Sequence, residues 1–226
     1  MNDAGAEGAR PSQRLVSLIR ACQERSPHVC KEFDLLFRTG FPRHPIPFFG
    51  RLETARVLTV GLNPSTTEFE ARRCWPYELT TERLAHRLYN YFKLPYPPPH
   101  PWFGDLHQGL RIINCSYDAG AAHIDASPWP TLGPGCLQKR NLLSSYKALL
   151  ASEIGHLSHL LDFCPSLNLV IILIADPERS LAMSAIARRF RGRVETVRKN
   201  QLAPWVWKNR RELAALVESK AVDCPS

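Results

Sequence analysis

Short, nearly continuous apolar runs alternate with helical patterns along this chain, and that alternation restricts the possible folds more than any other feature. The runs at 56–62, 110–115 and 168–175 are rich in Val, Ile and Leu, and a weaker run covers 194–198. Strands of a parallel sheet have this composition because helices bury both of its faces. We therefore predict an α/β fold, a three-layer α/β/α sandwich around a central, mainly parallel four-stranded sheet.

Patterns with helical spacing lie between and around these runs. After Thr80, a favourable N-cap residue, Leu84 and Leu88 continue one apolar stripe. The helices expected from such spacing cover 13–23, 81–92, 138–163, 179–190 and 205–218. Two segments rich in proline and aromatic residues, FPRHPIPFFG and LPYPPPHPWFGD, are expected to form ordered loops beside the strand ends.

The length of the chain fits one domain with one core. Its 226 residues, of which 44% are hydrophobic and 22% charged, are typical of an ordinary soluble globular protein. We expect one domain over 13–220, a mobile tail over 1–12 and a C-terminal tail over 221–226. No apolar run reaches the length of about 20 residues that a membrane span needs, and the N-terminus lacks a secretory pattern. We therefore expect a cytoplasmic monomer that does not contact a membrane.

The cysteine pattern does not favour a metal site or a cofactor. Seven cysteines occur, an odd number, and none belongs to a Cys-x-x-Cys pair. We expect reduced, mostly buried thiols, no metal ion and no cofactor. Neither common glycine-rich phosphate loop is present, which argues against a nucleotide-using α/β enzyme.

Positive charge is concentrated near the C-terminal end of the sequence. The formal net charge is +8, and the window 188–211 contains nine basic residues and one acidic residue. The rest of the chain is therefore balanced in charge. Such a window favours a surface that faces a polyanion, and a solvated basic helix face is the alternative.

The segment VLTVGLNPS, residues 57–65, places an amide side chain where the first apolar run ends. Pro64 cannot continue the strand, so Asn63 is expected to project into the crevice above the sheet, where open α/β sheets bind ligands. The alternative is a simple turn followed by a helix cap, because Asn-Pro-Ser-Thr-Thr is also favourable turn chemistry.

This segment resembles the first motif of the uracil-DNA glycosylase superfamily, in the branch that has Asn where other branches have Asp or Glu. The resemblance extends over about residues 42–215. It implies that Asn63 orients a water molecule, that Leu62 contacts the flipped base and that Ser65 contacts DNA. The aromatic residue on which members stack the base corresponds to Trp75, with Tyr77 beside it, and ordinary packing is the alternative.

Two later motifs of the superfamily have partial counterparts. Its second strand ends in an Asn that reads the pyrimidine edge, and LRIINCS offers Asn114, for which backbone capping is the alternative. Its last strand leads to His-Pro-Ser, but this chain has VRKNQLAPW, with Lys199, Asn200 or Gln201 in place of the histidine. Lys199 and Asn200 are therefore candidates for stabilising the leaving base.

A further group of polar residues follows the second apolar run, in YDAGAAHIDASPWPT. His123 and Asp125 are candidate acid–base partners that replace the missing histidine, with Tyr117 beside the base. The alternative is that the His–Asp pair only stabilises a turn.

The resemblance also implies DNA contacts in the basic C-terminal window. Leu202 or Trp205 is the expected wedge that fills the base stack after the nucleotide has left it. The other expected DNA contacts are Arg198, Gln201, Lys208, Arg210 and Arg211.

The function expected on these grounds is that of a monofunctional DNA glycosylase, which flips a pyrimidine out of DNA and leaves an abasic site. The substrate is either a uracil-type base, as in repair, or a hypermodified cytosine of phage DNA, as in antiviral defence. The alternative is a catalytically silent DNA-binding relative.

Overall fold

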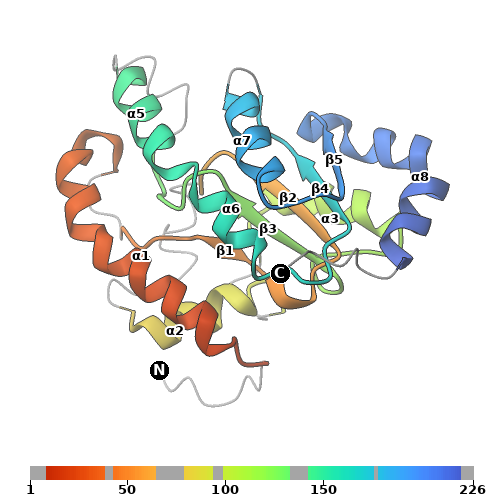
Figure 1. The fold of residues 1–226 in the computed structure, drawn as a ribbon, viewed down its shortest axis with the longest axis horizontal. Coiled ribbons are helices and arrows are strands. Elements are labelled where there is room, and N and C mark those ends of the chain that lie inside the picture. Colours follow the sequence, from red (N-terminus) through yellow and green to blue (C-terminus); the bar gives the residue numbers. More distant parts are fainter. Residues whose placement is uncertain are drawn as a thin grey trace.

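A five-stranded sheet lies at the centre of the molecule, with its strands in the order β1-β3-β2-β4-β5 (Figure 1). The computed structural model describes residues 9–38, 43–64, 79–93, 99–132, 142–175 and 178–219. The strands are β1 (Phe48–Phe49), β2 (Val57–Gly61), β3 (Ala121–Asp125), β4 (Leu169–Ile172) and β5 (Arg193–Thr196). The pairs β2–β3, β2–β4 and β4–β5 are parallel, and β1 pairs antiparallel with β3.

The predicted α/β class and mainly parallel sheet are confirmed, but the sheet has five strands rather than four. The additional strand is β1, in which Phe48 pairs with Ile124 and Phe49 pairs with His123. Its two residues are too few to produce a recognisable period in the sequence.

The expectation that 110–115 forms the second parallel strand is wrong. Leu110 lies near the end of α3, the next residues form turns, and β3 begins only at Ala121. Phe103, Leu106 and Leu110 are all buried and are spaced as one face of a helix, so the apolar run is the end of that face.

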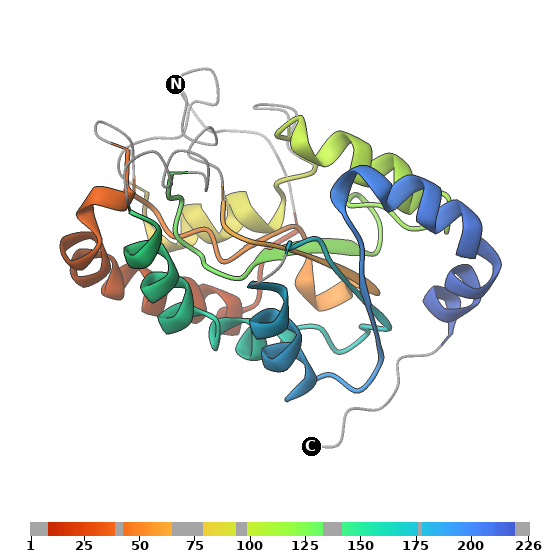
Figure 2. The ribbon, with the colours of Figure 1, turned by 90° about the horizontal axis from the view of Figure 1, so that it is seen from above.

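Helices cover both faces of the sheet, and Figure 2 shows α3 and α8 on one side with α6 and α7 on the other. The helices are α1 (Gln13–Glu32), α2 (Thr81–Tyr89), α3 (Trp102–Arg111), α5 (Leu143–Glu153), α6 (His156–Leu161), α7 (Glu178–Ala187) and α8 (Leu202–Glu218). Short 3-10 helices are η1 (Asp34–Leu36), η2 (Leu52–Thr54) and η5 (Lys199–Gln201). None of these described helices combines the length and apolar character that crossing a lipid bilayer requires.

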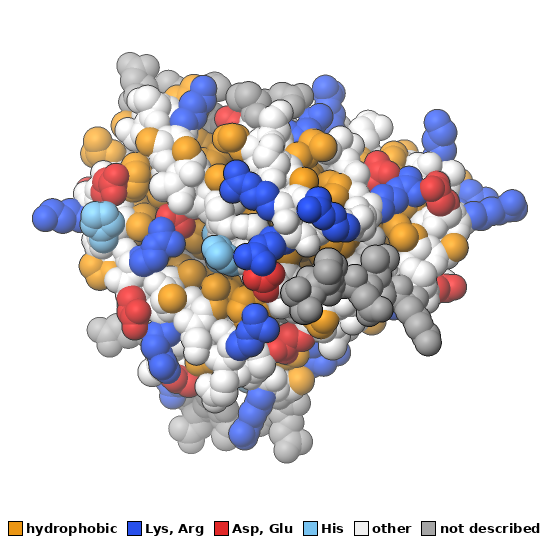
Figure 3. Space-filling view, viewed as in Figure 1, with side chains coloured by type: hydrophobic (Ala, Val, Ile, Leu, Met, Phe, Trp, Pro, Cys, Tyr) orange, Lys and Arg blue, Asp and Glu red, His pale blue; other side chains and the backbone are white. Residues whose placement is uncertain are grey.

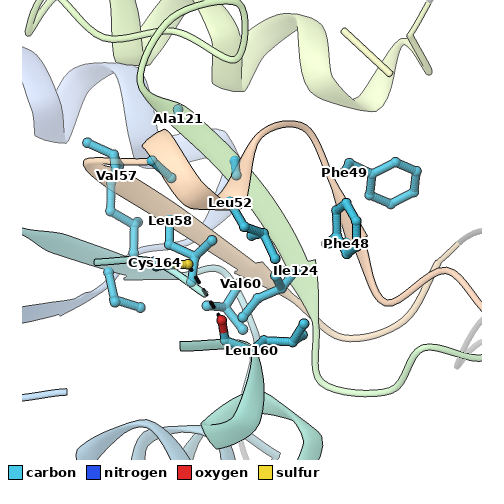
Figure 4. Close-up of a cluster of buried hydrophobic side chains, with 14 of the residues drawn as sticks. Phe48, Phe49, Leu52, Val57, Leu58, Val60, Ala121, Ile124, Leu160 and Cys164 are labelled. Carbon is cyan, nitrogen blue, oxygen red and sulfur yellow. Dashed lines mark hydrogen bonds between the residues drawn. The ribbon is translucent and has the colours of Figure 1, made fainter. Parts of the chain in front are cut away.

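The largest group of buried side chains surrounds β2 and β4. In the close-up of Figure 4, Leu58 and Val60 of β2 lie beside Leu160 of α6 and Cys164 just after it. The Cys164 thiol donates a hydrogen bond to the backbone oxygen of Leu160 at 3.6 Å, and burial raises the pKa of this thiol. A second, smaller group of buried side chains surrounds Trp129 beside α5.

The parallel strands give the sheet two different ends, here called the carboxyl end and the amino end. From β2 the chain proceeds to β3 on one side, whereas β4 pairs with β2 on the other side. The strands that follow β2 and β4 along the chain, β3 and β5, therefore lie on opposite sides of this central pair. Open α/β sheets bind ligands at such a point because the diverging loops leave a crevice between them.

Candidate functional site

A pocket of about 330 Å³ lies at the carboxyl end of the sheet. Its lining contains 61–64 after β2, His123 and Asp125 from β3, and 173–175 after β4. The other lining residues are Phe49, His100, Trp102, Phe103 and Lys199. The pocket thus lies where the topology of the sheet places a ligand site, and it contains side chains from segments far apart in the sequence.

Asn63 reaches this pocket because β2 ends at Gly61. Its amide nitrogen donates hydrogen bonds to the backbone oxygen of Pro64 at 3.0 Å and to Oγ1 of Thr131 at 3.2 Å. The hydroxyl of Tyr146 donates to the amide oxygen at 3.1 Å. Burial raises the pKa of Tyr146, so this hydroxyl keeps its proton at neutral pH. The amide orientation is therefore fixed, and an amide oxygen that accepts one bond has capacity for a second donor.

A chain of hydrogen bonds leads through the buried side chains of β2 and β3 to the pocket. The hydroxyls of Tyr117 and Thr59 are 2.7 Å apart, and Thr59 Oγ1 lies 2.8 Å from Nδ1 of His123. His123 Nε2 lies 3.3 Å from Oδ1 of Asp125. Burial raises the pKa of Tyr117, so this phenol keeps its proton. Every proton has an acceptor when Tyr117 donates to Thr59, Thr59 to His123 and His123 to Asp125.

Gly61 provides the space that this His–Asp pair occupies. A Cβ atom on Gly61 would lie 2.2 Å from Oδ1 of Asp125 and 3.0 Å from Nε2 of His123. The first distance is far below van der Waals contact, so a larger residue would displace the carboxylate. Glycine is therefore required at the end of β2 because its partner in the neighbouring strand, Asp125, occupies the space of a Cβ atom.

Aromatic rings form one wall of the pocket. The ring centroids of Trp102 and Phe103 lie 5.0 and 5.1 Å from that of the His123 imidazole, and the Phe49 centroid lies 6.0 Å from it. Trp102 and Phe103 are in the first turn of α3, a segment expected to be a loop. The wall gives a flat ligand an apolar surface next to hydrogen-bonding groups.

Lys199 brings a positive charge to the same pocket. It belongs to η5, the short helix that follows β5, and its Nζ lies 5.2 Å from the centroid of the Trp102 ring. The same ammonium lies 3.8 Å from the carboxylate of Asp105. Asn200 and Gln201, the other candidates for this position, are exposed and do not line the pocket.

Asn114 does not reach the pocket. It follows α3 with a φ of 53°, and its amide donates to Oε1 of Glu218 at 3.4 Å. Arg56, just before β2, donates to the backbone oxygen of Val217, which places this part of α8 at the amino end of the sheet. The expectation that Asn114 ends a strand beside the base is therefore wrong. The strand next to β2 on this side of the sheet is β3, and it ends at Asp125.

Other predicted site residues have different positions. Leu62 lines the pocket, whereas Tyr117 contributes through Thr59 from a buried position. Three predicted residues, Ser65, Trp75 and Tyr77, lie outside the described residues.

The basic window is divided between the two ends of the sheet. Residues 188–191 connect α7 to β5 at the amino end, whereas Arg198 and Lys199 follow β5 at the carboxyl end. Lys208, Arg210 and Arg211 lie along α8. Figure 3 shows Lys and Arg side chains of the whole chain at several separate places on one face of the molecule. The window therefore does not form one continuous surface.

Of the two residues expected to form the wedge, only Leu202 needs correction. It is 1% exposed and lies against α3, whereas Trp205 is partly buried and stays a prediction. The exposed aromatic residue of α8 is Trp207, which is 60% exposed and has the Arg210 guanidinium 4.5 Å from its ring centroid. Sequence reasoning missed Trp207 because neighbouring tryptophans on one helix cannot be assigned to the core or the surface without knowing the helix orientation.

Four residues of the pocket that lie in the two segments rich in proline and aromatic residues were not predicted individually, namely Phe49, His100, Trp102 and Phe103. These segments were expected beside the strand ends. That expectation was the available signal, but composition alone does not indicate which rings face a cavity.

Together, the fold and the pocket define an α/β protein with a ligand site at the carboxyl end of a mainly parallel sheet. Comparison with known proteins found no match among protein-family models and no match among curated proteins. The chemistry of the site must therefore be argued from its own residues.

Proposed function

We propose that this protein is a monofunctional DNA glycosylase of the uracil-DNA glycosylase type, built as an α/β/α sandwich. The observation that supports this proposal is the convergence of Asn63, Asp125 and Lys199 on one pocket with an aromatic wall. These groups come from three different loops or strand ends, and each matches one requirement of base excision. The proposal includes a cytoplasmic monomer with DNA as its partner and no cofactor.

A flipped base would pack against the aromatic wall. Trp102 is the favoured ring because it is only partly buried, whereas Phe49 is 2% exposed. Stacking of a base on an aromatic side chain contributes about 1–3 kcal/mol, which offsets part of the cost of unstacking it from DNA.

Asn63 would hold the attacking water. An amide is not a base, so its contribution is to position the water with its oxygen below C1′ of the sugar. The hydrogen bonds from Tyr146 and to Thr131 keep this oxygen in place before the substrate arrives. In the reaction the water oxygen bonds to C1′, the N-glycosidic bond breaks, and a water proton leaves with the base.

Lys199 and Asp125 would contact the leaving base. Negative charge develops on the base as the bond to the sugar breaks, and the Lys199 ammonium can stabilise it. The Asp125 carboxylate is held by His123 and can accept a hydrogen bond from the base. These two residues replace the histidine that the superfamily has after its last strand.

The exposed basic residues near this end would bind the phosphates. Arg198 adjoins Lys199, and Lys208, Arg210 and Trp207 follow on α8. Trp207, with Arg210 beside its ring, takes the place of the buried Leu202 as the apolar residue that contacts the duplex.

The test is release of a base from labelled duplexes that contain uracil, another deaminated base or glucosylated hydroxymethylcytosine, detected as alkali-labile abasic sites. We expect release from one of them, and a loss of about 100-fold or more in Asn63→Ala with DNA binding retained. Asn114→Gly is the matched control, because this asparagine lies at the other end of the sheet, and it should keep full activity. If the wild-type protein binds every duplex and releases no base, the silent DNA-binding relative is the better description.

A further inference from the structure

We infer that the pocket selects a base with an exocyclic amino group, and that Asp125 is the residue that makes this selection. The inference rests on the proposed function and deepens it by naming the class of substrate. Its basis is the kind of hydrogen-bonding group at the end of β3, where a carboxylate occurs instead of an amide.

Asp125 is a nearly buried hydrogen-bond acceptor in the wall of the pocket. The residue is 4% exposed, lines the pocket, and has one carboxylate oxygen engaged by His123 Nε2. Within the described part of the chain, its second oxygen has no hydrogen-bond partner. An ionised carboxylate has no proton to donate, so a ligand at this position must supply one.

The hydrogen-bond chain behind Asp125 keeps its carboxylate a hydrogen-bond acceptor. The chain is satisfied when Tyr117 donates to Thr59, Thr59 donates to Nδ1 of His123, and Nε2–H of His123 donates to the carboxylate. A partner that donates from behind leaves the carboxylate as an acceptor on the pocket side. The absence of a side chain on Gly61 lets the carboxylate stay there, because a Cβ would overlap Oδ1.

Cytosine and uracil differ in what they present to such a group. Cytosine-type bases carry an amino donor at C4, whereas uracil and thymine carry a carbonyl oxygen there. Uracil also has an N3–H, but two carbonyl oxygens flank it, so a carboxylate that accepts this proton also faces an acceptor. Two acceptors without a proton between them are costly in a buried site. The amino base is therefore favoured, and Lys199 can donate to its carbonyl oxygen or ring nitrogen.

An asparagine at the same place would not discriminate in this way. Its amide has both a donor and an acceptor, so it can pair with either base after rotation. A site built around one hydrogen bond rejects an analogue that lacks the partner by factors of about 10⁴ or more. The substitution Asp125→Asn therefore isolates the selection from the rest of the pocket.

The experiment uses three matched pairs of bases in single-stranded oligonucleotides: cytosine with uracil, 5-methylcytosine with thymine, and 5-hydroxymethylcytosine with 5-hydroxymethyluracil. The members of each pair have the same substituent at C5 and differ only at C4. In the pairs that are processed, we expect the amino member to lose its base at least about 100-fold faster in the wild-type protein. Asp125→Asn should lower that ratio to about tenfold or less. Faster release of the carbonyl member, or a ratio that Asp125→Asn does not change, would overturn the inference.

Asp118→Asn is the control for the chemical change itself. Asp118 is exposed, lies 3.7 Å from His107 and does not line the pocket, so its substitution should leave every ratio unchanged. The preference of the wild-type protein remains a test of the inference even if Asp125→Asn does not fold.

A binding measurement separates this inference from the proposed function. Calorimetric titration of the wild-type protein and Asp125→Asn with cytidine and with uridine requires no bond cleavage. We expect cytidine to bind at least about tenfold more tightly, with the difference lost in Asp125→Asn. If no oligonucleotide loses a base, the cytidine preference still decides the inference, whereas the proposed glycosylase activity is decided by the duplex test. Equal binding of the two nucleosides would overturn it.

Discussion

The two ends of the sheet contain similar polar residues and use them in different ways. At the carboxyl end, Asn63 and Asp125 border a pocket, and neighbouring side chains hold their polar atoms in place. At the amino end, Arg56, Asn114 and Asn168 all donate hydrogen bonds to the last residues of α8 or to the residue after them. There the polar groups fasten a helix to the sheet. Whether an asparagine can contact a ligand therefore depends on the end of the sheet at which it lies. The residue type alone does not indicate this.

The largest effect that would test this contrast is expected from Gly61→Ala. The added Cβ would overlap the Asp125 carboxylate, so either the carboxylate or β2 must move. We expect base release to fall about 100-fold or more, since a displacement of about 1 Å has such consequences. The free energy of unfolding should fall by about 1–3 kcal/mol, measured by chemical denaturation.

Gly104→Ala is the control for this substitution. Gly104 lies in α3, and no atom within 4 Å would meet its Cβ. Activity should be unchanged, and stability should rise by about 0.5–1 kcal/mol because alanine is the better helix residue. Full activity in Gly61→Ala would show that the position of Asp125 does not matter to the reaction.

A smaller effect is expected from Tyr146→Phe. This change removes the hydroxyl that donates to the Asn63 oxygen and leaves the amide less firmly oriented. Base release should fall about fivefold, which corresponds to the loss of one directed hydrogen bond of about 1 kcal/mol, with DNA binding unchanged. Tyr89→Phe, at the end of α2 and away from the pocket, should not affect the rate. An unchanged rate in Tyr146→Phe would mean that the other two bonds suffice to orient the amide.

The division of basic residues between the two ends predicts unequal effects on DNA binding. Arg198→Ala should reduce the slope of log affinity against log salt by about 1, because one phosphate contact near the pocket is lost. Arg188→Ala, at the amino end, should leave the slope unchanged. The measurement is fluorescence anisotropy with one duplex over a series of salt concentrations. A slope that is reduced by the same amount in both variants would show that DNA also contacts the amino end.

The smallest effects are expected at Asn114, where backbone conformation matters more than chemistry. Its φ of 53° is in the left-handed region, which glycine adopts freely and alanine does not. Asn114→Gly should change the free energy of unfolding by less than about 0.5 kcal/mol, whereas Asn114→Ala should cost about 1 kcal/mol. Thermal unfolding of both variants checks this order, and a more stable alanine variant would contradict it.

The strands and helices that could be predicted are those whose apolar patterns are long and unambiguous. The run at 56–62 contains β2, and the run at 168–175 contains β4. Within the described residues, the expected helix at 138–163 is observed as α5 and α6, which are separated at 154–155. The run at 110–115 misled because six apolar residues suit the end of a buried helix as well as a strand.

Two strands were not predicted, β1 and β3. The second of them has the sequence AAHID, in which Ile124 is the single β-branched residue. Its strand conformation depends on pairing with β1 and β2, which is tertiary information that local propensity does not contain.

The polar residues of the candidate site could be predicted from the sequence, whereas its aromatic residues could not. Asn63, His123, Asp125 and Lys199 were each singled out in the sequence, and the structure places all four around one pocket. Their catalytic roles remain predictions. The aromatic wall could not be predicted because Phe49 of β1 and Phe103 of α3, whose ring centroids are 5.3 Å apart, come together only in the folded chain.

The two outermost strands have a consequence for handling the protein in solution. β1 has only two residues, and β5 carries Arg193 and Glu195, which form an ion pair with each other, while Arg193 also pairs with Glu212 of α8. Unpaired strands at the margins of a sheet invite strands of other molecules to add and so start aggregation, and short length and charge both oppose this. The sheet therefore gives intermolecular strand pairing little to build on, a property that favours long titrations at high protein concentration.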